Sequence, residues 1–176
     1  HRSGKWVGRP SLRRIPVMIV SVQPSDDMAF FNRVVNHPEI SPFVRDDMVV
    51  GDIDCSVLND SNSVRLKIIV DKVDAGFAIL IRMKAGEYEL HSGLLSQYRG
   101  KIAVAAGLAI IAWARASNVC SRLTTWAWES ARHVLLITRR IGFQEEARQD
   151  WPNTVHGKRV RRIIFAINFN PVSTCP

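Results

Sequence analysis

YELHSGLLSQYRGKIAVAAGLAIIAWA, residues 88–114, is the stretch that decides the fold of this chain. Its first part predicts a β-strand over residues 87–95, and its apolar, alanine-rich part predicts a helix over residues 99–115. A glycine turn joins them, and Gly100 and Lys101 fall in the first helical turn. A helix N-terminus presents unpaired N–H groups and the positive end of the helix dipole. The stretch therefore predicts a strand–turn–helix unit with a seat for a phosphate at its turn.

The sequence around this unit predicts a single α+β domain. The expected order is a strand and a helix, a three-stranded antiparallel meander, the long helix, a strand, a helix and two closing strands. Ser25 and Ser130 are expected to cap the first and last helices, and Gly142 to end the last one. Residues 53–58 fit either a short strand or a helical turn. The other expected strands are residues 17–22, 64–70, 77–83, 122–128, 142–148 and 159–169.

Composition limits the partners. The formal net charge of +8 favours anionic partners such as phosphorylated cofactors, nucleic acid or acidic surfaces, although it also fits a chain that is merely kept soluble. Residues 1–16 form a basic arm that is expected to be disordered or tag-derived, residues 17–170 the domain, and residues 171–176 a tail. The longest apolar run, residues 102–114, is too short to cross a membrane, so no membrane partner is expected.

Three cysteines, Cys55, Cys120 and Cys175, show no metal-ligand spacing. They predict a reduced, intracellular protein without a metal site.

Several segments of the sequence resemble the GNAT superfamily of N-acetyltransferases. QYRGKIAVAAG (97–107) is similar to the family's acyl-CoA-binding signature, and RHVLLITRRIGFQEEAR (132–148) to its next helix and "GF" strand. With them, NRVVNHPEISPFV (32–44), GDIDCSVL (51–58) and GEYELHSGLLSQYRG (86–100) resemble the phage-encoded, acetyltransferase-like branch. The resemblance covers nearly the whole chain. It implies a mixed, mostly antiparallel sheet of six to seven strands flanked by helices. It also implies that the protein is located in the cytoplasm of a phage-infected bacterium or in a virion.

The resemblance also implies acetyl-CoA as cofactor and an amine as acceptor, expected to be a lysine or an N-terminus of a protein. The pantetheine arm would lie along the fourth strand at Leu94 and Leu95, in a splay between the fourth and fifth strands. The pyrophosphate would sit on the turn from Tyr98 to Ala103. The expected cofactor-binding residues are Leu94, Leu95, Gln97, Tyr98, Arg99, Gly100, Lys101, Ile102 and Ala103.

Three positions depart from the family pattern. Ile102 stands where the family has Gly or Ala, and would crowd the phosphates unless Ala103 takes that place. Ala131 and Thr138 stand where the family has an Asn and often a Tyr that protonates the leaving thiolate. These departures support the alternative that the fold is kept as a catalytically silent virion component or host-protein-binding module.

Acetyl transfer to an amine needs a group that accepts the proton of the nucleophile. Glu87, Glu89 and His91 alternate on the fourth strand and therefore share one face. His91 and Glu89 are the candidate catalytic residues, because an imidazole titrates near neutral pH and a buried glutamate can be tuned upward. The other interpretation is an ordinary polar strand face.

The tryptophans and the closing basic strand have simpler interpretations. Trp113, Trp126 and Trp128 are expected to pack in the core or on the sheet. Lys158, Arg159, Arg161 and Arg162 fit either a solvated outer face or a weak electrostatic contact with nucleic acid, and no aromatic stacking platform stands among them. The oligomeric state is left open.

Overall fold

One seven-stranded sheet with the order β1-β2-β3-β4-β5-β7-β6 organises the chain. The computed structural model describes residues 18–58, 61–118 and 120–169, so the basic arm expected at 1–16 and the tail lie outside the described residues. Within these ranges β4 and β5 are the only parallel neighbours, and the other pairs are antiparallel. The predicted α+β class and the mixed, mostly antiparallel sheet are confirmed. The strands are β1 (Val20–Pro24), β2 (Ser63–Val70), β3 (Val73–Lys84), β4 (Glu87–Leu94), β5 (Arg122–Trp128), β6 (Gln144–Val155) and β7 (Lys158–Asn168).

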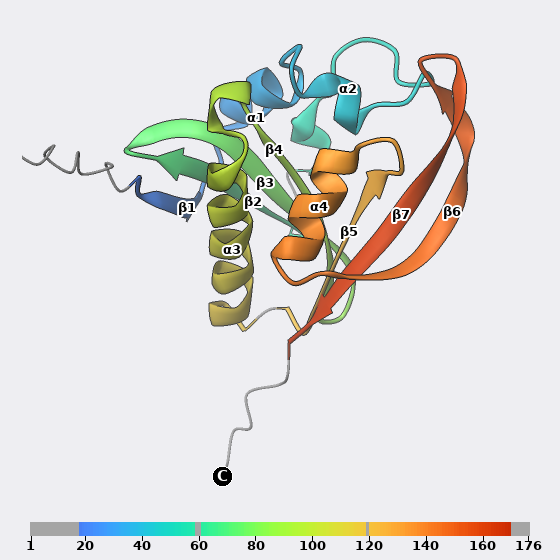
Figure 1. Ribbon diagram of the computed structural model, residues 1–176. Coiled ribbons are helices and arrows are strands. Elements are labelled where there is room, and N and C mark those ends of the chain that lie inside the picture. Colours follow the sequence, from blue (N-terminus) through green and yellow to red (C-terminus); the bar gives the residue numbers. More distant parts are fainter. Residues whose placement is uncertain (1–17, 59–60, 119, 170–176) are drawn as a thin grey trace, which may run out of the picture.

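Helices cover both faces of the sheet. On one face lie α3 (Lys101–Ala116) and α4 (Arg132–Arg140), in front of the strands in Figure 1. Their buried residues join those of β2, β3, β4, β5 and β7 in the larger core. The helix α1 (Met28–Val35) packs on the opposite face, against Phe77 and Ile79 of β3. The short helix α2 (Ser41–Val44) and the 3₁₀ turns η1 (Cys55–Leu58) and η2 (Ser96–Tyr98) complete the domain.

Helix ends differ from the sequence prediction. Asp27, not Ser25, caps α1, because its carboxylate accepts the N–H of Phe30 at 3.0 Å. Ala131, not Ser130, occupies the N-cap of α4, without a side-chain cap hydrogen bond. At the other end the prediction is confirmed: Gly142 has a φ of +103° and follows the C-cap of α4.

Residues 53–58 form a helical turn rather than a strand, and two side chains of α1 explain why. Asn36 exchanges two hydrogen bonds of 2.8 Å with the backbone of Ile53. Asn32 accepts the N–H of Cys55 at 2.7 Å. These amides satisfy the backbone polar groups of the segment, so it needs no partner strand.

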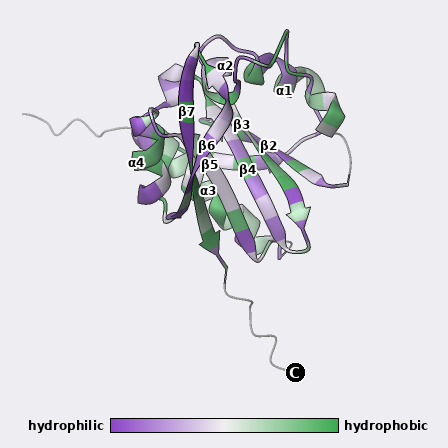
Figure 2. Ribbon diagram, turned by 90° about the vertical axis from the view of Figure 1, so that its right-hand side faces the viewer, coloured by the Kyte–Doolittle hydropathy of each residue, from purple (hydrophilic) through white to green (hydrophobic). Residues whose placement is uncertain are grey.

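The long β6–β7 ribbon rises beside the rest of the sheet (Figure 1), and Figure 2 shows β7 hydrophilic near the turn and hydrophobic toward its C-terminal end. Its turn is tied to the segment after α2. The carboxylate of Asp47 accepts the hydroxyl of Thr154 at 2.6 Å and the N–H groups of His156 and Gly157 at 2.8 Å each. These bonds lower the pKa of Asp47, the Thr154 hydroxyl most of all. The same contacts hold residues 45–50 against the hairpin.

Two cysteines are described, and both are buried thiols. Burial raises the pKa of Cys55 and of Cys120, which keeps them protonated and unreactive. Cys175 lies outside the described residues. In the described part of the chain no helix is long and apolar enough to cross a membrane, and no cluster of His, Cys, Asp or Glu could hold a metal ion.

Candidate functional site

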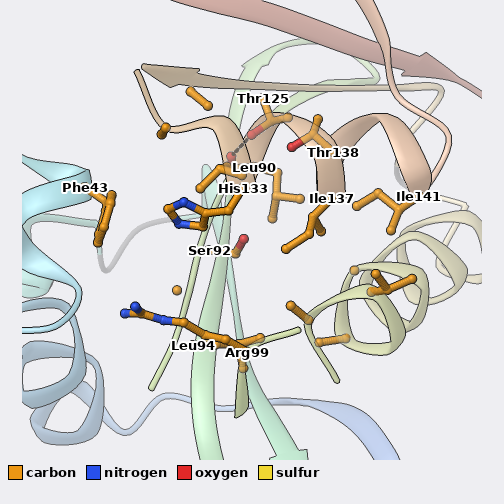
Figure 3. Close-up of a pocket in the computed structure, with 18 of the residues that line it drawn as sticks. Phe43, Leu90, Ser92, Leu94, Arg99, Thr125, His133, Ile137, Thr138 and Ile141 are labelled. Carbon is orange, nitrogen blue, oxygen red and sulfur yellow. Dashed lines mark hydrogen bonds between the residues drawn. The ribbon is translucent and has the colours of Figure 1, made fainter. Parts of the chain in front are cut away.

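The parallel strands β4 and β5 separate soon after they meet. They pair only from Glu87 to Glu89 on β4, yet β4 continues to Leu94 and β5 to Trp128. Just beyond the last pair, the Thr125 hydroxyl donates to the Leu90 carbonyl at 2.9 Å (Figure 3). Past this point, alternate backbone N–H and C=O groups of β4 face the gap without a strand partner. The sheet is therefore splayed, as the resemblance implies.

A cavity of about 880 Å³ occupies this splay. Its walls come from β4, β5, α3 and α4, and they are mainly apolar. Figure 3 shows Leu90, Ser92 and Leu94 of β4 facing Ile137 and Ile141 of α4 across the cavity. A volume of this size and an apolar lining with a few polar groups are typical of sites for cofactors and small molecules.

One end of the cavity is electropositive. It reaches the N-terminus of α3, where Gly100 is the N-cap with a φ of +75°, and no side chain among the described residues caps the helix. The first-turn N–H groups of α3 are thus available to an external acceptor. Arg99 and Lys101, on either side of Gly100, also line the cavity. This end has the donors and the charge that a phosphorylated group requires.

The predicted cofactor-binding residues divide into two groups. Leu94, Arg99, Gly100, Lys101 and Ala103 line the cavity. The lining does not include Leu95, Gln97, Tyr98 or Ile102.

Two members of the second group matter for the interpretation. The N–H of Leu95 donates to Ala75 on β3 at 3.1 Å, and its side chain packs in the smaller core with α1. Ile102 does not line the cavity, whereas Ala103 does, so the small residue at the phosphate end is Ala103. The Ile102 side chain is therefore not placed to crowd a phosphate in the cavity, contrary to what the sequence had led us to expect.

The cavity mouth is framed by α2 and α4. Phe43 and His133 meet edge to face with ring centroids 5.5 Å apart, on opposite sides of the opening in Figure 3. The guanidinium of Arg99 lies 5.8 Å from the Phe43 ring and donates to the Glu39 carbonyl at 2.7 Å. The Glu39 carboxylate accepts the hydroxyl and N–H of Ser96, and these bonds lower its pKa. This linked set holds the segment before α2 against the turn that precedes α3.

Ala131 and Thr138 both line the cavity. Both are buried, and Figure 3 shows Thr138 on α4. No tyrosine lines the cavity within the described part of the chain. The positions that carry Asn and Tyr in the family are therefore in the expected place but hold a methyl group and an aliphatic hydroxyl.

The candidate catalytic pair lies on the other face of β4. His91 Nε2 donates to the Glu89 carboxylate at 2.8 Å, with 30% and 26% of the two side chains exposed. His91 lines the cavity, and Glu89 stands behind it. Because Nε2 donates, Nδ1 is the ring nitrogen that can accept a proton.

To act as the base, Glu89 would need burial to raise its pKa, but the pKa of Glu89 is lowered. The hydrogen bond from His91 is the largest cause that lowers the Glu89 pKa, and burial opposes it. A bond from Trp126 and the charge of Arg162 add to the lowering. Glu89 is therefore an ionised partner of His91 rather than a proton acceptor itself.

Aromatic side chains extend this face from β5 to β6. Trp126 lies 6.1 Å from His91, 4.8 Å from Trp128 and 6.2 Å from Trp151, measured between ring centroids. Trp128 is buried, as predicted, but Trp126 and Trp128 also line the cavity. No pattern in the sequence singles out Trp151.

Arg162 of β7 lies on this aromatic surface, although no aromatic residue stands among the basic residues of β7 themselves. The platform comes from β5 and β6, which sequence spacing along β7 cannot reveal.

No protein-family model and no curated protein matches the sequence. Solved structures do match. The spermidine N-acetyltransferase of Vibrio cholerae, in complex with CoA and spermine, aligns with a TM-score of 0.72 at 13% identity over 85% of this chain and 95% of that one. A GNAT-family acetyltransferase of Streptococcus pneumoniae gives 0.66 at 15% identity over 86% and 100%.

A third match is the aminoglycoside acetyltransferase AAC(6′)-Ib in complex with paromomycin and acetyl-CoA. It gives a TM-score of 0.67 at 12% identity over 85% of this chain and 93% of that one. The fold of this chain is therefore that of the GNAT acetyltransferases, which confirms the architecture that the resemblance implied.

Proposed function

We propose that the protein is an acyl-CoA-dependent N-acetyltransferase that uses acetyl-CoA. The observation that carries the proposal is the cavity in the β4–β5 splay, which reaches from the positive end of α3 to His91. Structural neighbours crystallised with CoA or acetyl-CoA support it. When bound, acetyl-CoA would supply an activated acetyl group.

The residues present fit such a cofactor. The open first turn of α3, with Arg99 and Lys101, would hold the phosphates. Leu94, Val104 and the α4 isoleucines would hold the apolar part of the pantetheine chain, and the free edge of β4 offers backbone groups for its amides.

The residues that would accept the proton of the amine lie on the opposite face of the sheet. Nδ1 of His91 would take the proton of an attacking amine. Glu89 orients the ring and would stabilise the imidazolium that forms, since it is ionised and 2.8 Å away. The leaving thiolate has no tyrosine in the described lining, so water would protonate it.

The first test is calorimetric titration with acetyl-CoA, followed by thiol detection of released CoA in the presence of amines. Ala103→Phe places a large side chain in the lining of the cavity, whereas Ala112→Phe makes the same change at an exposed position of α3. We expect Ala103→Phe to abolish binding and Ala112→Phe to preserve it. Wild-type protein that does not bind acetyl-CoA would exclude the proposed function.

A second candidate is a catalytically silent binding module, which Ala131 and Thr138 favour because they replace the family's polar groups. It predicts that acetyl-CoA binds but no CoA is released with any amine. A protein lysine or N-terminus as acceptor, the phage-type origin with its host-cytoplasmic or virion location, and weak electrostatic binding of nucleic acid stay predictions. Peptide substrates and the salt dependence of nucleic-acid binding would test the first and the last.

A further inference from the structure

The sheet face that bears His91 continues into a tryptophan cluster, made of Trp126, Trp128 and Trp151. Trp126 and Trp151 are nearly parallel, with an interplanar angle of 18°, and Trp128 packs edge-on against both. Since Trp126 contacts His91 and lines the cavity, the cluster borders the place where an amine would react. An acceptor molecule would therefore rest against a rigid aromatic surface.

Arg162 supplies a cation on that surface. Its guanidinium lies 4.6 Å from the Trp151 ring centroid and 5.8 Å from that of Trp126, and its Nε donates to Gln149 at 2.8 Å. No carboxylate forms a salt bridge with it among the described residues, whereas Arg161 next to it is paired with Asp150 at 3.0 Å. A guanidinium held by stacking, with its terminal nitrogens unpaired, matches the geometry of a carboxylate.

Trp128 provides a second donor. Only 4% of the residue is exposed, it lines the cavity, and its indole N–H has no hydrogen-bond partner among the described residues. A buried donor without a partner is unfavourable, so an oxygen acceptor on a ligand would compensate it.

The acidic groups nearby are already engaged. Glu89 binds His91, and Asp46 accepts the indole N–H of Trp151 at 2.8 Å and the amide of Asn153 at 2.9 Å. A polycationic amine would need free carboxylates on this surface, and these two are already hydrogen-bonded.

We propose that the acceptor is an amine that carries a carboxylate, recognised by Arg162 on the tryptophan cluster. The proposal rests on the proposed function and names the substrate class of the same site. The amine would point toward His91, and the carboxylate would bind Arg162. A free amino acid and an acidic peptide both offer this chemistry.

The test compares matched ligands that differ only in the carboxylate. The panel contains α-amino acids and 6-aminohexanoate, their primary amides, the corresponding simple amines, spermidine, and peptides with or without an acidic residue near the amine. Arg162→Met removes the guanidinium, and Arg161→Met is the matched control on the neighbouring position. Each protein is assayed for CoA release, and each ligand is titrated by tryptophan fluorescence, which reports binding at the cluster without turnover.

We expect at least one acid to exceed its amide by roughly ten- to hundredfold in kcat/KM and in affinity, as for a charge-assisted hydrogen bond. The preference should vanish in Arg162→Met and persist in Arg161→Met. If the preference for the acid over its amide occurs only with free amino acids, or only with acidic peptides, that class is the source of the carboxylate.

Equal or better use of amides, simple amines or spermidine would overturn the proposal, as would an unchanged preference in Arg162→Met. If no acid quenches fluorescence more tightly than its amide, the proposal also fails. This result is distinct from failure of the proposed function, which calorimetry with acetyl-CoA decides separately.

Discussion

Replacing Glu89 by Gln tests the role of His91 directly. The substitution keeps the shape of the side chain and removes the charge that lies 2.8 Å from His91 Nε2. A hydrogen bond to a charged group contributes about 1.5–3 kcal/mol. If this bond stabilises His91 only after it has taken the proton of the amine, losing it raises the barrier by that energy, and kcat should fall roughly ten- to hundredfold.

The matched control is Glu87→Gln, two residues earlier on the same strand face. The Glu87 carboxylate pairs with Lys84 at 3.1 Å and with Arg122 at 3.5 Å, away from the cavity lining. This variant should keep the wild-type kcat and pH profile. If both variants retain wild-type kinetics, the pair on β4 is an ordinary polar strand face and His91 is not the base.

The same substitution has a pH-dependent effect on stability. The pKa of Glu89 is lowered in the folded state, so its contribution is fully present above the ordinary value of 4.5 and is lost as pH falls through the lowered one. The free energy of unfolding should therefore differ most between wild type and Glu89→Gln near neutral pH. The difference should shrink below about pH 4.5 in urea titrations.

Three further changes test the frame of the site. Gly76→Ala should lower the free energy of unfolding by about 1–3 kcal/mol in urea titrations, because a Cβ there would clash with the Gly93 carbonyl of the adjacent strand. Gly93→Ala meets side-chain atoms of Phe77 and Ile40 rather than backbone and should cost less, and equal effects would contradict the argument. Phe43→Ala should raise the KM for acetyl-CoA up to about tenfold, since an aromatic pair contributes about 0.5–1.5 kcal/mol at the mouth; an unchanged KM would show that the mouth contributes nothing. Asp47→Ala should accelerate amide exchange at the β6–β7 turn, where its carboxylate accepts two N–H groups, and protected amides there would refute that role.

Local pattern was enough to predict most of the fold. Arg122–Trp128 was predicted to the residue, because β-branched and aromatic residues are bounded by polar ones. The helix caps were mistaken by one or two residues, since Ser25 and Asp27 are both good capping residues and only the chain path decides between them. The helical turn at 53–58 depends on Asn32 and Asn36, whose side-chain partners are distant in sequence.

The site was predicted less completely than the fold. The turn at Gly100 was recognisable, because glycine with positive φ before an apolar helix is a local signal. The aromatic surface under Arg162 could not be recognised in the sequence. It combines residues of β5, β6 and β7, which become neighbours only through the order of the strands in the sheet. Ile102 was expected to crowd the phosphates, but its side chain does not line the cavity. The direction in which a helical side chain points is not known until the helix is placed against the sheet.

The splay between β4 and β5 also constrains the order of events in the proposed reaction. The electropositive end of the cavity lies on the α3–α4 face, and His91 with the tryptophan cluster lies on the other, so donor and acceptor can occupy their places at the same time. Neither described cysteine lines the cavity, and burial keeps both thiols protonated, so neither is placed to carry the acetyl group between half-reactions. We therefore expect a ternary complex with direct transfer, and double-reciprocal plots at several acceptor concentrations should intersect rather than run parallel.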